Sequence, residues 1–148
     1  MEDCPVTLPN GKFPGKENYE DFNLGNESGT IFTIPWSDGK VVFEPGGPGE
    51  ISPDGSLSMK WPWYRTVPGE VVINGRRLDT EAPPMPEITL RGVPDGYSET
   101  GFHPSALTWP SEGCWEITAQ VGAESLTFVT LVIRVLPETP ESPSIASR

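Results

Sequence analysis

The residues best suited to bind a ligand are aromatic and basic side chains that lie close together in the sequence. They are Trp61, Trp63, Tyr64, Arg65, Arg76 and Arg77. Aromatic ring faces stack on sugar rings, and an arginine fork grips a carboxylate through two parallel hydrogen bonds. Four of the six residues lie in the segment KWPWYR, residues 60–65. The segment therefore predicts a recognition surface for a sugar or an acidic group.

The same segment also fits a crowded piece of core. If residues 60–65 form a strand, alternation points Trp61 and Trp63 to one face and Tyr64 to the other. Pro62 has no N–H to donate, so such a strand lies at a sheet edge or is bulged there. In this alternative Trp61 packs into the core, Trp63 and Tyr64 cover one end of the fold, and arginines stack on the rings. The sequence leaves both interpretations open.

Charge separates this part of the chain from the rest. The chain carries 21 acidic and 10 basic residues, a net charge of −11, which argues against nucleic acid as a partner because phosphates repel an acidic protein. Between residues 60 and 91, however, the bases outnumber the acids by one. These bases are Lys60, Arg65, Arg76, Arg77 and Arg91. The segment is either a nearly neutral patch or a site for an acidic or sugar ligand.

His103 is the only histidine and the one residue that suggests hydrolysis. Ser105 follows two positions later, but GFHPS lacks the G-x-S-x-G pattern of a nucleophile elbow. A small hydrolase that uses these two residues remains an alternative, and we expect no enzyme. One histidine and two distant cysteines do not supply the usual ligands of zinc or copper. We also expect no metal and no cofactor, because no glycine-rich phosphate loop follows a strand.

The two cysteines, Cys4 and Cys114, predict a disulfide between distant parts of the chain. Such a bridge closes a loop of about 110 residues and stabilises the fold by about 5 kcal/mol if chain entropy alone is counted. It would pin an N-terminal arm, and two free thiols are the alternative. Disulfides favour an extracytoplasmic location. The first residues lack the regions of a signal peptide, so we expect a mature form whose signal was removed, or else a cytosolic protein.

Eighteen prolines and 16 glycines are spread along the chain, which argues against long helices. Short apolar runs lie between them, and none reaches the length of about 18 residues that spans a membrane. Strands are expected at residues 30–36, 40–44, 56–65, 70–74, 75–78, 87–93, 106–110, 114–121 and 125–135. Asn74-Gly75 predicts a tight hairpin turn. Asp-Gly pairs predict further turns or, alternatively, a surface Ca²⁺ site.

Short strands with turns every eight to twelve residues predict an all-β fold. We expect a single antiparallel β-sandwich of about seven to nine strands. Residues 1–29 are expected to form an extended arm, residues 30–136 the sandwich, and residues 137–148 a disordered tail rich in Pro, Ser and Glu. Within the arm, Asn26-Glu27-Ser28 has the form of a glycosylation sequon.

The last two strands allow finer predictions. Alternation in residues 114–121 puts Trp115 in the core and Cys114 outside, so a bridge to Cys4 would staple the arm across the outer face of that sheet. In residues 125–135 the apolar positions change phase near Val129. Either both faces of this strand are covered or a β-bulge shifts the phase, and we favour the bulge.

The run LTWPSEGCWEITAQVGAESLTFVTLVIRV, residues 107–135, resembles the last hairpin of many bacterial Ig-like or fibronectin-like sandwich domains. A longer pattern, from SLSMKWPWYR through INGRRLD to GYSETGFHPSALTWPSEGCWEITAQVG, resembles uncharacterised bacterial proteins that are exported or lipoprotein-like. The resemblance implies an exported Ig-like β-sandwich and carries over no catalytic residue.

Three functions follow as expectations. The first is a non-catalytic, extracytoplasmic β-sandwich for protein–protein interaction or assembly at the cell surface, with another protein or a second copy as partner. Its contacts would be the N-terminal arm and the Pro-rich edge strand. The second is a carbohydrate-binding module that uses Trp61, Trp63, Tyr64 and neighbouring arginines, and the third is a small hydrolase. Exposed, coplanar rings would favour the second function.

Overall fold

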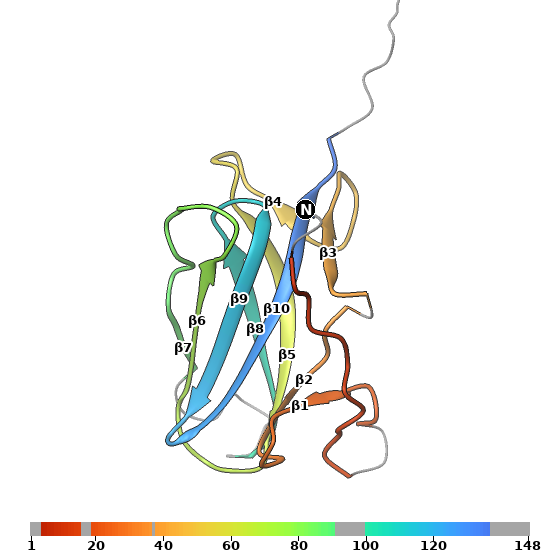
Figure 1. Ribbon diagram of the computed structural model, residues 1–148, viewed down its shortest axis with the longest axis vertical. Helices are drawn as coiled ribbons and strands as arrows, with labels where there is room; N and C mark the ends of the chain where they lie inside the picture. The colour runs from red at the N-terminus through yellow and green to blue at the C-terminus, as the bar shows by residue number, and fades with distance from the viewer. Residues whose placement is uncertain (1–3, 16–18, 37, 91–99, 137–148) are drawn as a thin grey trace, which may run out of the picture.

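The computed structural model describes residues 4–15, 19–36, 38–90 and 100–136. The tail predicted to be disordered, residues 137–148, lies outside the described residues. The described part of the chain consists of strands, turns and loops, and it contains no helix long and apolar enough to cross a membrane. The expected all-β fold is confirmed, and two sheets enclose the main hydrophobic core (Figure 1).

Each sheet has five described strands. Sheet A contains β1 (Leu24–Gly25), β2 (Ile31–Thr33), β4 (Glu50–Ile51), β5 (Leu57–Arg65) and β8 (Gly101–Trp109). Sheet B contains β3 (Lys40–Phe43), β6 (Val71–Arg77), β7 (Ile88–Leu90), β9 (Gly113–Val121) and β10 (Glu124–Arg134). These ten strands exceed the expected seven to nine, because the arm contributes β1 and the loop before β5 contributes β4. The pairs are antiparallel except β3 with β10, which is parallel.

Strand β5 is the centre of sheet A. On one side it pairs with β8 along its whole length, from Leu57 opposite Trp109 to Arg65 opposite Gly101. On the other side, β4 pairs near its start and β2 near its end. Pro62 falls between these two short pairings. The prediction that Pro62 marks a sheet edge or a bulge is therefore wrong. Strand β5 is central and its register with β8 is unbroken, and the missing N–H of Pro62 falls in the gap between the pairings with β2 and β4.

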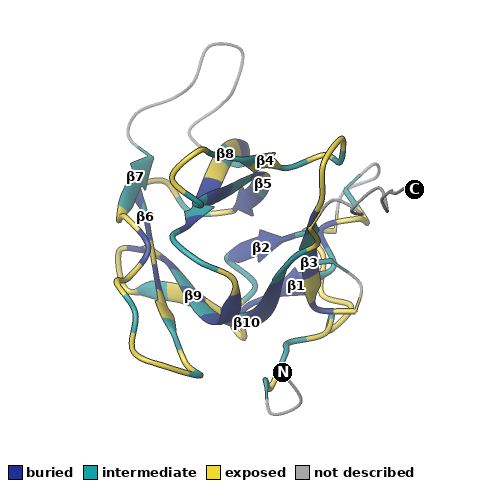
Figure 2. Ribbon diagram, turned by 90° about the horizontal axis from the view of Figure 1, so that it is seen from above, coloured by how far each residue is buried: buried dark blue, intermediate teal, exposed yellow. Residues whose placement is uncertain are grey.

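Alternation along β5 decides which of its residues enter the core. The inward residues are buried and apolar, namely Leu57, Met59, Trp61 and Trp63. Trp61 stacks on Phe128 of β10, with ring centroids 5.9 Å apart and an interplanar angle of 9°. Figure 2 shows buried segments on strands of both sheets, while the connecting loops are largely exposed. The core of the sandwich is thus built on aromatic contacts between β5 and β10.

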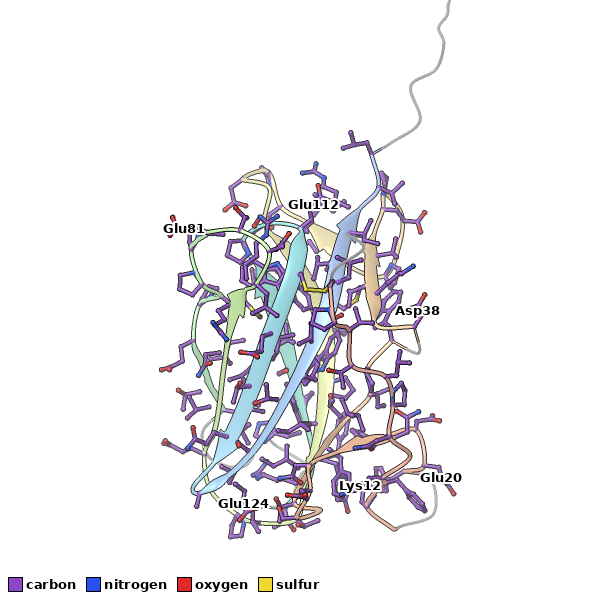
Figure 3. The ribbon with its side chains drawn as sticks, in the orientation of Figure 1. Lys12, Glu20, Asp38, Glu81, Glu112 and Glu124 are labelled. Atoms are coloured by element: carbon purple, nitrogen blue, oxygen red, sulfur yellow. A yellow bond between two sulfur atoms is a disulfide. The ribbon has the colours of Figure 1, made fainter. Side chains whose placement is uncertain are left out.

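The N-terminal arm is held on its own chain. Cys4 and Cys114 form the predicted disulfide, with Cα atoms 5.6 Å apart (Figure 3). Trp115 faces the core as expected. Thr7 donates its backbone N–H to the Val129 carbonyl at 2.8 Å, and Val129 donates its N–H to Thr7 Oγ1 at 2.8 Å. The arm therefore covers the edge of β10 below β3 (Figure 1).

Strand β10 has no bulge. It pairs with β9 through nine consecutive residues without a break in register, so the predicted bulge near Val129 is wrong. Both faces of the strand are covered instead. Val132 faces the core, while Leu131, opposite Cys114, is buried on the face across which the disulfide holds the arm. The apolar positions of β10 change phase because the N-terminal arm packs on the outer face of this strand.

Asn74 and Gly75 do not form a hairpin turn. Both lie inside β6, where Gly75 is opposite Ile117 of β9. Met85 donates its N–H to the Gly75 carbonyl at 3.0 Å, and a Cβ at Gly75 would lie 2.3 Å from the Met85 sulfur. The glycine therefore permits a close approach by the chain segment before β7. The turn prediction fails here because glycine is also favoured inside a strand at a point where another segment of the chain approaches closely.

Candidate functional site

The rings of the KWPWYR segment are buried. Trp61 and Trp63 are 2% and 1% exposed, and both belong to the main core. Tyr64 points to the outer face of sheet A but is only 5% exposed. The interpretation of these three side chains as an exposed ring platform is therefore wrong. The core alternative is right for Trp61, but Trp63 also lies in the main core instead of covering one end of the fold, and Tyr64 lies in a separate cluster on the outer face.

The arm covers Tyr64 with an aromatic cluster. The ring centroids of Tyr19 and Phe22 lie 4.9 and 5.8 Å from that of Tyr64, and Phe32 of β2 lies 6.4 Å away. Such pairs contribute about 0.5–1.5 kcal/mol each beyond the area that they bury. Sequence analysis missed this cluster, because residues 19–22 show no strand periodicity that would mark them as buried.

The predicted ligand-binding arginines already have partners within the chain. Arg65 is buried, and its Nη1 donates to His103 Nδ1 at 2.7 Å. Arg76, the most exposed of the three, lies with Nε 2.9 Å from a carboxylate oxygen of Glu116. Arg77 forms an ion pair with the carboxylate of Asp79. Each of the three guanidinium groups thus binds a partner within the chain. The prediction that these arginines bind a ligand therefore has no support.

Arg77 and Asp79 brace the strand that carries Cys114. Arg77 donates from Nε and Nη2 to the two carboxylate oxygens of Asp79 at 2.8 and 3.1 Å, and Asp79 Oδ1 also accepts from the Cys114 N–H at 3.1 Å. The hydrogen bond from Arg77 is the main cause of the lowered pKa of Asp79, and it also raises the pKa of Arg77. A Cβ at Gly113 would lie 2.2 Å from Arg77 Nε, so this position requires glycine.

The side chains of His103 and Ser105 project toward the core of the sandwich. Burial, and secondly the charge of Arg65, lower the pKa of His103. His103 Nδ1 must accept the bond from Arg65, because arginine has no acceptor. Ser105 Oγ donates to the Trp61 carbonyl at 2.8 Å and accepts from Trp63 Nε1 at 2.8 Å. Both side chains are thus occupied by other partners, which removes the basis for a histidine–serine pair.

The Asp-Gly pairs act as turn formers where the structure describes them. Asp54 accepts from the Ser56 N–H at 2.9 Å and from its hydroxyl at 2.7 Å, and Asp38 accepts from the Lys40 N–H at 3.1 Å. The third pair, at Asp95, lies outside the described residues. Among the residues that are described, no three His, Cys, Asp or Glu side chains gather as metal ligands.

The outer face of sheet A carries an apolar hollow of about 510 Å³, which we name the β5–β8 groove. It is lined by Lys60, Trp61, Pro62, Phe102, Pro104, Ser105 and Ala106. The ladder places Pro62 opposite Pro104, and Lys60 opposite Ala106. Because directly opposed residues project from the same face, two strands build one continuous surface. A groove on paired strands is also held more rigidly than one on loops.

Two opposed prolines shape this surface. The Pro62 carbonyl accepts from Thr33 Oγ1 of β2 at 2.6 Å, so it points away from β8. Both prolines therefore occupy positions at which the hydrogen bonding between β5 and β8 requires no backbone N–H donor. The backbone of Pro104 correspondingly faces the outer edge of β8, which pairs with no other described strand. A missing donor at that edge discourages the addition of a further strand.

A second hollow, of about 590 Å³, lies between residues 44–51 and the end of β10. It is lined by Glu44, Glu50 and Arg134 together with loop prolines and glycines. Its charges are mixed and its walls are mostly loop, so it defines a ligand less clearly than the β5–β8 groove.

Sequence analysis missed the groove because it expected no strand between residues 93 and 106. A histidine between an aromatic residue and a proline has no strand signature. The signal that could have found β8 is the alternation of buried His103, Leu107 and Trp109 with outward Pro104 and Ala106. Comparison of the sequence with protein-family models finds no match, and comparison with curated proteins finds none either.

Proposed function

We propose that this chain is a non-catalytic, Ig-like β-sandwich that acts as a protein-interaction domain of an exported bacterial protein, secreted or at the cell surface. Its contact surface is the β5–β8 groove. The observation that carries the proposal is an open apolar hollow on two paired nine-residue strands.

The composition of the groove supports contact with a protein. Pro104 and Ala106 are exposed side by side on β8, although this face could have carried charged residues like the rest of an acidic surface. An apolar hollow with few polar groups is the usual form of a binding site on a folded domain. The disulfide between Cys4 and Cys114 supports an oxidising, extracytoplasmic location.

Fewer observations support the other two functions. A carbohydrate-binding module needs exposed ring faces, and Trp61, Trp63 and Tyr64 are buried. A hydrolase that uses His103 and Ser105 needs these side chains near each other and open to a substrate, and both face inward with other partners. We therefore place the function on the outer face of sheet A.

Site-specific photo-crosslinking tests the contact surface. A photoreactive amino acid replaces Ala106 in the groove or, as the matched control, Gln120 on the outer face of sheet B. In envelope preparations from the source cells, position 106 should form a discrete protein adduct that position 120 does not form. An adduct with a second copy of this chain would identify self-assembly.

Affinity then decides whether the adduct reports a real interface. With the crosslinked protein purified, Ala106→Arg should weaken its binding at least about tenfold, because a charge in the apolar centre of an interface lacks a partner. Gln120→Arg should leave the Kd unchanged. Equal crosslinking from both positions, or equal Kd values for all three proteins, would overturn the proposed surface.

A further inference from the structure

We infer that the β5–β8 groove receives a protein segment in which an aromatic side chain stands next to a single carboxylate. The inference rests on the proposed function and specifies the chemistry of the partner. It combines the apolar lining of the groove with Lys60, the one cation among the described residues that line it.

Lys60 is the cation that the fold leaves available from the basic segment. Arg65, Arg76 and Arg77 hold partners within the chain, and Arg91 lies outside the described residues. Lys60 is exposed and forms no ion pair with any described residue. The bases between residues 60 and 91 predicted a site for an acidic ligand. Among the described bases of that segment, Lys60 is the one that we place in such a site.

One acid on the same face, Glu50, leaves Lys60 open to a partner. Glu50 lies opposite Ser58, two residues before Lys60 on β5, and both residues point outward. The structure does not pair the two charges. An incoming carboxylate therefore reaches Lys60 without displacing an existing ion pair. Glu50 would repel a second carboxylate, which favours a partner segment with only one.

The hollow favours an aromatic ring as the apolar anchor. Pro62, Phe102 and Pro104 supply apolar walls, and the small Ala106 leaves space between them. The Ser105 hydroxyl faces inward, where it bonds to Trp63 and to the Trp61 carbonyl, so the groove offers few hydrogen-bond partners. Aromatic side chains bury about 150–250 Å² each and are over-represented among the residues that anchor interfaces.

The charge of the whole molecule limits how acidic the partner is. The chain has a net charge of −11, and Figure 3 shows labelled acids such as Glu20, Asp38 and Glu124 on different parts of the surface. A partner that was acidic throughout would be repelled during approach. A neutral or basic partner with one carboxylate beside its aromatic anchor matches both the overall field and the local site.

Three small probes that differ only in charge test this chemistry. ¹⁵N-labelled protein is titrated with 3-phenylpropionate, 3-phenylpropionamide and 3-phenylpropylamine at pH 7 and about 150 mM salt, and amide shifts are followed by NMR. Amides of β5 and β8 around the groove should move, with Kd in the millimolar range for probes of this size. The carboxylate should bind about two- to fivefold more tightly than the amide, and the amine least tightly, as expected for one exposed ion pair.

Matched variants assign the effect to named residues. Lys60→Met should abolish the order among the probes, whereas Lys40→Met, a lysine on β3 of the other sheet, should preserve it. Ala106→Leu should fill the hollow and remove the binding of all three. The aromatic and acidic pair should also occur in the partner peptide recovered from the crosslink at position 106.

The possible failures are distinguishable. Equal binding of the three probes to the wild-type groove would overturn the carboxylate inference while leaving the proposed contact surface in place. Groove amides that do not shift with any probe would overturn the aromatic anchor, and the crosslinking at position 106 would still judge the surface itself. Preservation of the charge order in Lys60→Met would also overturn the inference, because the cation would then be elsewhere.

Discussion

Cys4 and Cys114 are joined by a disulfide across 110 positions of sequence, and the bond ties the start of the described chain to the outer face of sheet B. The other end of the arm lies on sheet A, where Tyr19 and Phe22 cover Tyr64. The arm therefore connects the two sheets along one side of the sandwich. A segment with little periodicity of its own becomes part of the fold through one covalent bond, hydrogen bonds to β10 and one aromatic cluster.

Removal of the disulfide should destabilise the protein strongly. Replacing both cysteines by serine should lower the free energy of unfolding by about 2–5 kcal/mol, because the long loop closed by the bond restricts the unfolded chain. Urea denaturation measures this, with reductant added to the wild type as a second route to the same state. Reductant should have no effect on the double variant. Equal midpoints for wild type and double variant would contradict the prediction.

Hydrogen exchange reports on the arm more directly. The Val129 N–H is bonded to Thr7 Oγ1, so its exchange should accelerate when the disulfide is absent. The Thr118 N–H, within the ladder between β9 and β6, serves as the reference amide on the same sheet. Unchanged protection of Val129 would show that the arm stays in place without its covalent link.

Tryptophan fluorescence should confirm that the aromatic segment is core. Four of the five tryptophans are buried, namely Trp61, Trp63, Trp109 and Trp115, and their emission should be blue and inaccessible to iodide. Trp36 is half-buried and should account for any quenchable part of the emission. In Trp36→Phe the emission should therefore resist iodide, and soluble polysaccharides should not change it. Red emission in this variant that a glycan protects would restore the carbohydrate-binding hypothesis.

Stability should fall as the pH decreases from 7 to 5, because of His103. Its pKa in the folded protein lies below the ordinary value of 6.5, so below that pH the unfolded chain takes up a proton that the folded chain does not. Acid therefore favours unfolding until the folded pKa is reached. Urea midpoints at pH 7, 6 and 5 should decline less steeply in His103→Gln than in the wild type. Equal slopes in the two proteins would exclude His103 as the cause.

Asn26 should act as a structural residue rather than an accessible sequon. It is 8% exposed, and its side chain donates to Thr30 Oγ1 and the Ser125 carbonyl and accepts from the N–H groups of Thr30 and Ile31. Asn26→Ala should cost about 2–4 kcal/mol in the free energy of unfolding, because buried polar groups lose their partners.

The sequon offers its own control. Ser28→Ala also destroys the tripeptide, but Ser28 is exposed, so its loss should cost less than about 1 kcal/mol. Thermal or urea denaturation of the two variants compares them directly. Similar midpoints for Asn26→Ala and Ser28→Ala would contradict the structural role of Asn26.

Local alternation of apolar and polar residues predicted the strands that have one apolar face. In β9, alternation correctly placed Trp115 inside and Cys114 outside, and in β5 it placed Trp61 and Trp63 on one face. Side chains in a strand alternate with a period of two, so a short stretch of sequence contains this information. The same patterns could not locate the groove, since Pro104 and Ala106 form it only when β8 lies beside β5.

Residue type and short-range periodicity were enough to predict the all-β class, the inward face of the long strands and the pair of cysteines available for a bridge. The other features arise from the tertiary structure. It covered Tyr64 and Leu131 with the arm, gave Arg76 and Arg77 their carboxylate partners, and left Lys60 at the rim of an apolar hollow. Whether a side chain is exposed or paired depends on segments distant in the chain, and local residue patterns carry no record of which segment that will be.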